Sequence, residues 1–147
     1  MMMLILAALA QPNRTLPASA HTYVAYVDRV VDGDTVVLDI ELGWGLWLLD
    51  QPVRLRNCWA PEMKEDKGPA AKASLEAILD NDHEADGFQP GAAVTLRSGT
   101  AKSLGEREKY GRILGDVLLD GVSVGGEQIR RGHATRTPEV SAVGPTT

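Results

Sequence analysis

Two carboxylates interrupt an apolar, β-branched run in this chain. Asp32 and Asp34 stand on either side of Gly33 in the segment VVDGDTVVLDI, whose other residues are mostly those of a half-buried strand. Asp-Gly is a strong signal for a tight turn between two strands, because glycine accepts positive φ and Asp bonds its own backbone. Such a turn explains Asp32 but needs only one acidic residue, so the turn alone does not explain Asp34.

Three further segments contain residues that suit work on a phosphate group. Arg54 follows a valine in VRL, Glu62 ends APE, and Arg112 ends KYGR. Arginine binds two phosphate oxygens through a planar fork that stays charged, and glutamate can take a proton from water. Each residue also has an ordinary interpretation: a surface arginine on a strand, an acidic helix entry, or the end of a hairpin. Their joint occurrence therefore matters more than any one of them.

The composition fits one globular domain and excludes several kinds of site. The chain has 147 residues, 44% hydrophobic and 24% charged, which are ordinary values for a domain with a modest core. Cys58 is the one cysteine, so an intramolecular disulfide or a cysteine zinc cluster is excluded. The three histidines are too scattered for a metal site. The net charge of −5 argues against coating nucleic acid through bulk charge, but it allows a local positive cleft.

The order of the elements predicts the fold. Strand patterns alternate with two helical patterns, expected as strands at 22–31, 35–42 and 52–58, a helix at 68–81, strands at 92–98 and 112–121, and a short helix within 123–134. This order predicts an α+β, mainly β fold: a five-stranded OB-type Greek-key barrel with one helix after strand 3 and a short helix after strand 5.

Tryptophans lie between the second and third strand patterns. Alternation predicts one shared apolar face made of Ile40, Leu42, Trp44, Leu46 and Leu48. Trp44 and Trp47 have two interpretations, a surface that stacks nucleobases or, more commonly, a cover for the core.

Together, the four segments resemble the staphylococcal nuclease-like (thermonuclease, TNase-like) family. VVDGDT, VRL leading to APE, an alanine-rich helix, KYGR, and DGVSV with IRRGHA follow in that order, from about Tyr23 to Ala134. The resemblance implies an OB barrel that hydrolyses phosphodiester bonds of DNA and RNA with calcium. A single-stranded or frayed nucleic acid is the expected partner, and we expect a monomer without a membrane span.

The resemblance also assigns roles to residues of this sequence. It implies that Arg54 and Arg112 grip the scissile phosphate and that Glu62 activates the attacking water. Lys109 and Tyr110 then flank the substrate phosphate. These roles agree with the chemistry, because hydrolysis needs a base near the water and positive groups where negative charge develops.

The implied calcium site is built around Asp34, with Asp32 beside it and the backbone carbonyl of Ala60 as a further ligand. The family has a second calcium-binding aspartate two positions before the proline of APE, where this chain has Trp59. Because tryptophan donates no oxygen, the resemblance implies a weaker calcium site. A non-catalytic OB module that binds nucleic acid or a protein therefore stays as the alternative function.

The two ends of the sequence lie outside the expected domain at 21–136. Residues 1–20 contain the apolar run LILAALA and the tripeptide ASA, which fit either a signal peptide or a disordered leader. A cleaved signal would make the protein secreted or part of the cell envelope, and otherwise it would be cytoplasmic. Residues 137–147 show no periodicity and are expected to be a disordered tail.

Overall fold

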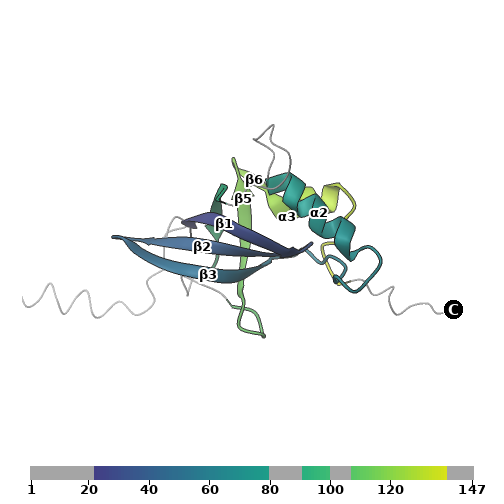
Figure 1. Cartoon of the computed structure of the whole chain (residues 1–147), viewed down its shortest axis with the longest axis horizontal. Coiled ribbons are helices and arrows are strands. Elements are labelled where there is room, and N and C mark those ends of the chain that lie inside the picture. Colours follow the sequence, from purple (N-terminus) through teal and green to yellow (C-terminus); the bar gives the residue numbers. More distant parts are fainter. Residues whose placement is uncertain (1–21, 80–90, 100–106, 139–147) are drawn as a thin grey trace, which may run out of the picture.

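The computed structural model describes residues 22–79, 91–99 and 107–138, which form a barrel with two helices at one end (Figure 1). The leader expected at 1–20 and all but the first two residues of the expected tail lie outside these ranges. Among the described residues, no helix is both long and apolar enough to cross a bilayer.

Five strands close into the barrel. They are β1 (Thr22–Asp32), β2 (Thr35–Gly43), β3 (Leu46–Leu55), β4 (Ala93–Arg97) and β5 (Ile113–Leu119). The antiparallel order is β3-β2-β1-β4-β5, and a parallel pairing of residues 53–55 with 113–115 joins β3 to β5. The expected five-stranded OB-type barrel is confirmed.

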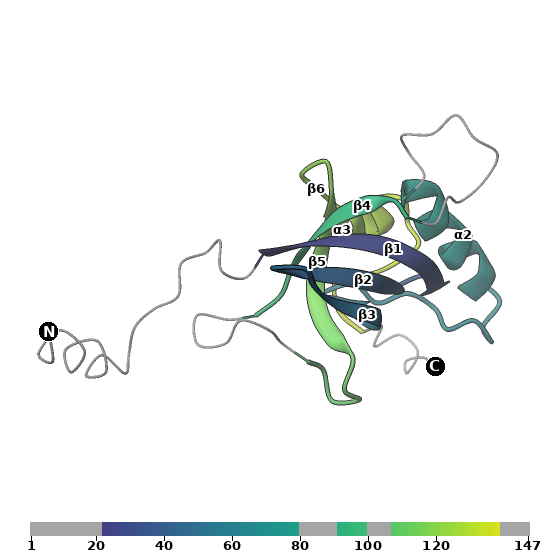
Figure 2. The same ribbon diagram turned by 60° about the vertical axis from the view of Figure 1, so that its left-hand side comes forward.

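Two helices cover one end of this barrel, as expected. α2 (Gly68–Leu79) follows β3, and α3 (Val124–Arg130) follows β5; Figure 2 shows both at the end away from the β2–β3 hairpin. Pro69 stands in the first turn of α2, where a missing N–H costs no hydrogen bond. The Ser123 hydroxyl caps α3 by accepting a hydrogen bond from a first-turn N–H at 3.1 Å. The buried stripe of α2 consists of Ala71, Leu75, Ile78 and Leu79.

Two details of the strands differ from the expectation. β3 begins at Leu46 rather than at residue 52, so the hairpin with β2 is longer than its third-strand pattern indicated. A two-residue strand, β6 (Val122–Ser123), also pairs with β5 after a tight turn at Asp120 and Gly121. A strand of this length has no sequence periodicity, so no pattern could predict it.

The alternating face expected from Ile40 to Leu48 is wrong at Trp44. Trp44 lies in the turn between β2 and β3 with φ of 59°, between two glycines that also have positive φ, and its side chain is fully exposed. Trp47 is also exposed, and its ring lies 5.7 Å from that of Tyr26. The turn broke the alternation, and neither tryptophan belongs to the core.

The interior of the barrel is mainly aliphatic. Its largest fully buried apolar side chains include Leu38, Leu55, Leu75, Leu79, Leu96, Val27, Val36, Val53 and Val117. The buried polar residues of the described chain are Asp34, Thr35, Ser98 and Gln128. Two of these four, Asp34 and Thr35, belong to the Asp-Gly segment between β1 and β2. Burying a polar group without a partner is costly, so the stability of the turn between β1 and β2 depends on the contacts of these two side chains.

Candidate active site

All eight sequence-predicted site residues line one cleft of about 560 Å³. The cleft is formed where the end of β1 and the turn after it meet the end of β3, the loop after β3 and the segment that leads into β5, and Trp59 also lines it. The predicted residues in its wall are Asp32, Asp34, Arg54, Ala60, Glu62, Lys109, Tyr110 and Arg112. The structure thus brings together segments that are far apart in the sequence, while the roles of the residues stay predictions.

The Asp-Gly segment is a tight turn between β1 and β2, as its residue types predicted. The Asp34 N–H donates to Oδ1 of Asp32 at 3.1 Å, which is the local bond that makes Asp favourable in turns. A Cβ at Gly33 would lie 2.6 Å from the Cβ atoms of both Ala60 and Ala71, so only glycine fits without displacement. The Gly33 carbonyl accepts a hydrogen bond from Nε2 of Gln128, on α3, at 2.9 Å. Both faces of the turn are therefore fixed by the fold.

Asp34 is a buried carboxylate with three donors. Its Oδ2 accepts a hydrogen bond from the Ala60 N–H at 2.8 Å and lies 3.3 Å from the Arg54 guanidinium. Its Oδ1 accepts from the Thr35 hydroxyl at 3.1 Å. Burial raises the pKa of Asp34 to about 6, because the charged form loses water, although the Ala60 N–H and Arg54 act in the opposite direction. The carboxylate therefore depends on its donors to stay charged.

Arg54 is held in place by the loop that follows β3. Its Nη1 donates to the carbonyl of Leu55 at 2.7 Å and to the carbonyl of Cys58. Its guanidinium carbon lies 5.2 Å from the centre of the Trp59 ring, within the range of a cation–π contact. Arg54 thus lies between an aromatic ring and the buried carboxylate of Asp34, and it cannot move without losing several contacts.

Arg112 has a carboxylate partner of its own. Its Nε and Nη2 donate to Oε1 and Oε2 of Glu108 at 3.1 and 3.2 Å, a bidentate arrangement. Its Nη1 reaches the Thr35 hydroxyl at 3.4 Å, beside Asp34. The hydrogen bond from Arg112 lowers the pKa of Glu108, so Glu108 stays ionised and orients the guanidinium toward the cleft.

Glu62 is the most solvent-accessible of the predicted catalytic groups. Its side chain is 68% exposed, and Oε2 lies 3.1 Å from the Lys64 ammonium group. Its backbone N–H donates to the Glu65 carboxylate at 2.7 Å, which fixes the loop before α2. Glu62 therefore lines the cleft from a fixed backbone, with a solvent-exposed carboxylate that is paired with Lys64.

Lys109 and Tyr110 form the far wall. The Lys109 ammonium lies 5.0 Å from the centre of the Tyr110 ring, and the Arg112 guanidinium lies 5.8 Å from it. Tyr110 itself is 73% exposed. Its N–H donates to Glu108, so the same carboxylate positions both Tyr110 and Arg112.

The sequence reasoning missed Glu108 and Arg56, which also line the cleft. Glu108 stands directly before KYGR, four residues from Arg112, but the segment is a turn and not a helix, so the spacing gave no signal for their pairing. Arg56 follows Arg54 by two residues, so strand alternation predicts that both lie on one face. Arg56 reaches Asp116 at 3.7 Å.

The described residues fit the implied calcium site poorly. Calcium takes about six to eight oxygen ligands, and Trp59 supplies none where a carboxylate is expected. Ala60 faces Asp34 through its N–H, and the Arg54 guanidinium already lies beside the same Oδ2. Within the described ranges, no group of three histidine, cysteine, aspartate or glutamate side chains is placed to hold a metal ion. No step below therefore depends on a metal, and calcium dependence stays a prediction.

No family model matches the chain. The chain is similar to the protein named Endonuclease YhcR from Bacillus subtilis (strain 168), with 31% identity over 130 residues. The similarity covers 80% of this chain but 9% of that protein, so the chain corresponds to a small part of its relative. Together with the five-stranded barrel, this similarity supports a relationship to nuclease-like proteins in general.

Proposed function

We propose that this chain is a nuclease-type phosphodiesterase that hydrolyses DNA or RNA in the cleft around Asp34. The observation that carries the proposal is the meeting of Arg54, Arg112 and Glu62 in one cleft, beside a buried carboxylate. A similar protein named as an endonuclease supports the class of substrate. Two arginines and an accessible carboxylate are the groups that phosphodiester hydrolysis needs.

In the proposed reaction, the Glu62 carboxylate takes a proton from a water molecule as the water oxygen bonds to phosphorus. The bond from phosphorus to one sugar oxygen breaks, and that oxygen takes a proton from solvent. Glu62 suits this role because its exposed side chain can approach a water molecule over the cleft. Arg54 and Arg112 stabilise the negative charge that develops on the phosphate oxygens.

Arg54 and Arg112 are each paired with a carboxylate. The pairing reduces the net positive charge of the cleft, but it fixes the orientation of both guanidinium groups. Asp34 holds Arg54, and Glu108 holds Arg112. A substrate phosphate would meet guanidinium groups whose orientation is set before binding, which lowers the entropic cost of arranging them.

We propose a single-stranded or frayed substrate, because two aromatic rings flank the cleft. Tyr110 is 73% exposed and Trp59 is 37% exposed, so each has an accessible ring surface. Unpaired bases stack on such rings with little dependence on sequence, whereas paired bases are already stacked.

The test is digestion of a labelled single-stranded DNA and the matching RNA by the purified full chain. Reactions with calcium and with a chelator are compared, because calcium is the cofactor that the sequence resemblance implies. Cleavage that is lost in a Glu62→Gln variant is the expected result. If the wild-type chain cleaves neither substrate with calcium, the proposed function is wrong.

Trp59 favours a second candidate, a non-catalytic module that binds nucleic acid or a protein. Trp59 stands at the position where the family resemblance implies a metal-binding aspartate, and its ring packs against Arg54. This candidate predicts binding of single-stranded nucleic acid or a protein without cleavage under any metal condition. Fluorescence anisotropy with the same labelled oligonucleotides, measured beside the digestion, separates nucleic-acid binding from catalysis.

A further inference from the structure

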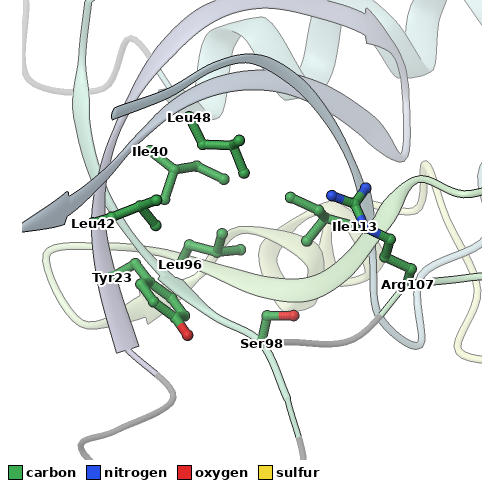
Figure 3. Close-up of a pocket in the computed structure, with 8 residues that line it drawn as sticks. All are labelled: Tyr23, Ile40, Leu42, Leu48, Leu96, Ser98, Arg107 and Ile113. Atoms are coloured by element: carbon green, nitrogen blue, oxygen red, sulfur yellow. The ribbon is translucent and has the colours of Figure 1, made fainter. Parts of the chain in front are cut away.

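A second pocket lies at the end of the barrel where β1 begins and β2 ends. It encloses about 460 Å³, and its described lining residues are all different from those of the cleft around Asp34. Figure 3 shows the aliphatic side chains around a common space, with Tyr23 and Ser98 at its lower edge. The pocket is lined by Tyr23, Ile40, Leu42, Leu48, Leu96, Ser98, Arg107 and Ile113. Its volume falls toward the lower end of the range of pockets that hold small molecules.

Aliphatic side chains make most of its wall. Five of the eight lining residues are leucine or isoleucine, and they come from β2, β3, β4 and β5. Leu96 and Ile113 are buried, whereas Leu42 is half exposed at the rim. The barrel core thus continues into a space that the described side chains do not fill. Covering this apolar surface with an apolar ligand would lower the free energy, because the surface would be removed from water.

The charge of the pocket has one sign. Among the residues that the structure describes, Arg107 is the charged residue of the lining, and no aspartate or glutamate lines the pocket. Nη1 of Arg107 donates to the Gly111 carbonyl at 2.7 Å, and the backbone of Arg107 forms a β-bridge with Ile113. Within the part of the chain that the structure describes, the Arg107 guanidinium has no carboxylate partner, unlike Arg54 and Arg112. The hydroxyls of Tyr23 and Ser98 add two further polar groups to the wall.

We propose that this pocket binds a medium-chain fatty acid, with the alkyl chain along the five aliphatic residues and the carboxylate on Arg107. A guanidinium matches a carboxylate through two parallel hydrogen bonds, and none of the described lining residues is acidic, so they do not repel an anion. The walls offer flexible aliphatic contact for a chain. They hold one aromatic ring, Tyr23, which favours an alkyl chain over a stacked nucleobase. The proposal does not depend on whether the cleft cleaves nucleic acid.

The test is isothermal titration calorimetry of the full chain with decanoate, kept below its micelle concentration. We expect saturable binding at one site, weakened about tenfold or more in Arg107→Gln, because a charge-assisted bidentate contact is lost. Arg97→Gln is the matched control: Arg97 is an exposed arginine on β4 that does not line the pocket. Decanol, which has the chain without the charge, should bind as weakly to the wild type as decanoate binds to Arg107→Gln.

A second pair of variants separates the pocket from the apolar hairpin beside it. Leu42→Asp places a negative charge at the pocket rim and should abolish decanoate binding, whereas Leu49→Asp lies on the exposed hairpin outside the pocket and should leave binding unchanged. Both side chains are at least half exposed, so neither change should unfold the barrel. Unsaturable binding, equal binding by Arg107→Gln, or equal loss in Leu49→Asp would overturn the proposal. Tighter binding of decyl phosphate than of decanoate would overturn the assignment of a carboxylate.

Discussion

The side-chain amide of Gln128 donates one hydrogen bond to the Gly33 carbonyl at 2.9 Å and another to the Ala71 carbonyl at 2.8 Å. Gln128 is fully buried on α3, and Gly33 lies between the two aspartates of the cleft. One side chain therefore ties α3 and α2 to the acidic turn. Its Oε1 has no partner among the described atoms, which makes the burial of this amide costly.

We predict that Gln128→Met destabilises the fold by about 2 kcal/mol, because two buried carbonyls lose their donor while the side-chain volume is kept. The free energy of unfolding is measured by urea denaturation. Gln51→Met is the control, since Gln51 is only partly buried and donates to the Leu49 carbonyl on its own strand. Equal free energies for the Gln128 and Gln51 variants would show that the two bonds contribute nothing.

Gly33→Ala should cost about 1–3 kcal/mol, because the new methyl group overlaps two neighbouring methyl groups held on different elements. Gly126→Ala is the control, because it should raise the free energy of unfolding instead of lowering it. A Cβ at Gly126, in α3, meets only Ser123 at 3.4 Å, and alanine favours a helix over glycine by up to about 1 kcal/mol. Thermal unfolding of both variants checks the pair. A neutral Gly33→Ala would mean that the turn can move away from Ala60 and Ala71.

The fold was largely predictable from the sequence, because strand and helix periods and the Asp-Gly turn are local signals. The site was predictable only in part. The family resemblance predicted that Arg54, Glu62 and Arg112 share one site, and they line one cleft, but pairings between distant side chains have no local signal. The contact of Gln128 with Gly33 and the direction in which Ala60 faces Asp34 depend on how α2, α3 and the loop after β3 pack. Trp44 was misplaced because a turn of three positive-φ residues interrupts the alternation.

Glu62→Gln should abolish cleavage and leave binding of single-stranded oligonucleotide nearly unchanged, because the amide keeps the shape of the side chain but cannot take a proton. Initial rates and fluorescence anisotropy are measured on the same preparation. Asp66→Asn is the control, since Asp66 is an exposed acid of the same loop and does not line the cleft. A Glu62→Gln variant with wild-type rates would remove Glu62 from the mechanism.

Arg112→Ala should lower turnover by about a hundredfold, because a preorganised positive group is lost where charge develops. It should also reduce the slope of log affinity against log salt by about 0.7, which is the value for one lost phosphate contact on a single strand. Arg130→Ala removes the same charge from α3, where Arg130 pairs with Glu127 outside the cleft. Equal salt slopes for the two variants would show that Arg112 does not contact phosphate.

The last prediction concerns Trp59, which occupies the place of an expected metal-binding carboxylate. Trp59→Asp should tighten calcium binding, measured by calorimetry, because calcium affinity rises with the number and charge of oxygen ligands. It should also raise cleavage at limiting calcium. The ring contact with Arg54 would be lost, and because Trp59 is 37% exposed and so mostly buried, we expect a loss of stability of about 2–3 kcal/mol. Trp47→Asp, on the exposed hairpin, controls for added charge. If Trp59→Asp folds but binds calcium no better than Trp47→Asp, the carboxylate of Asp34 serves Arg54 rather than a metal, and the binding-module candidate gains support.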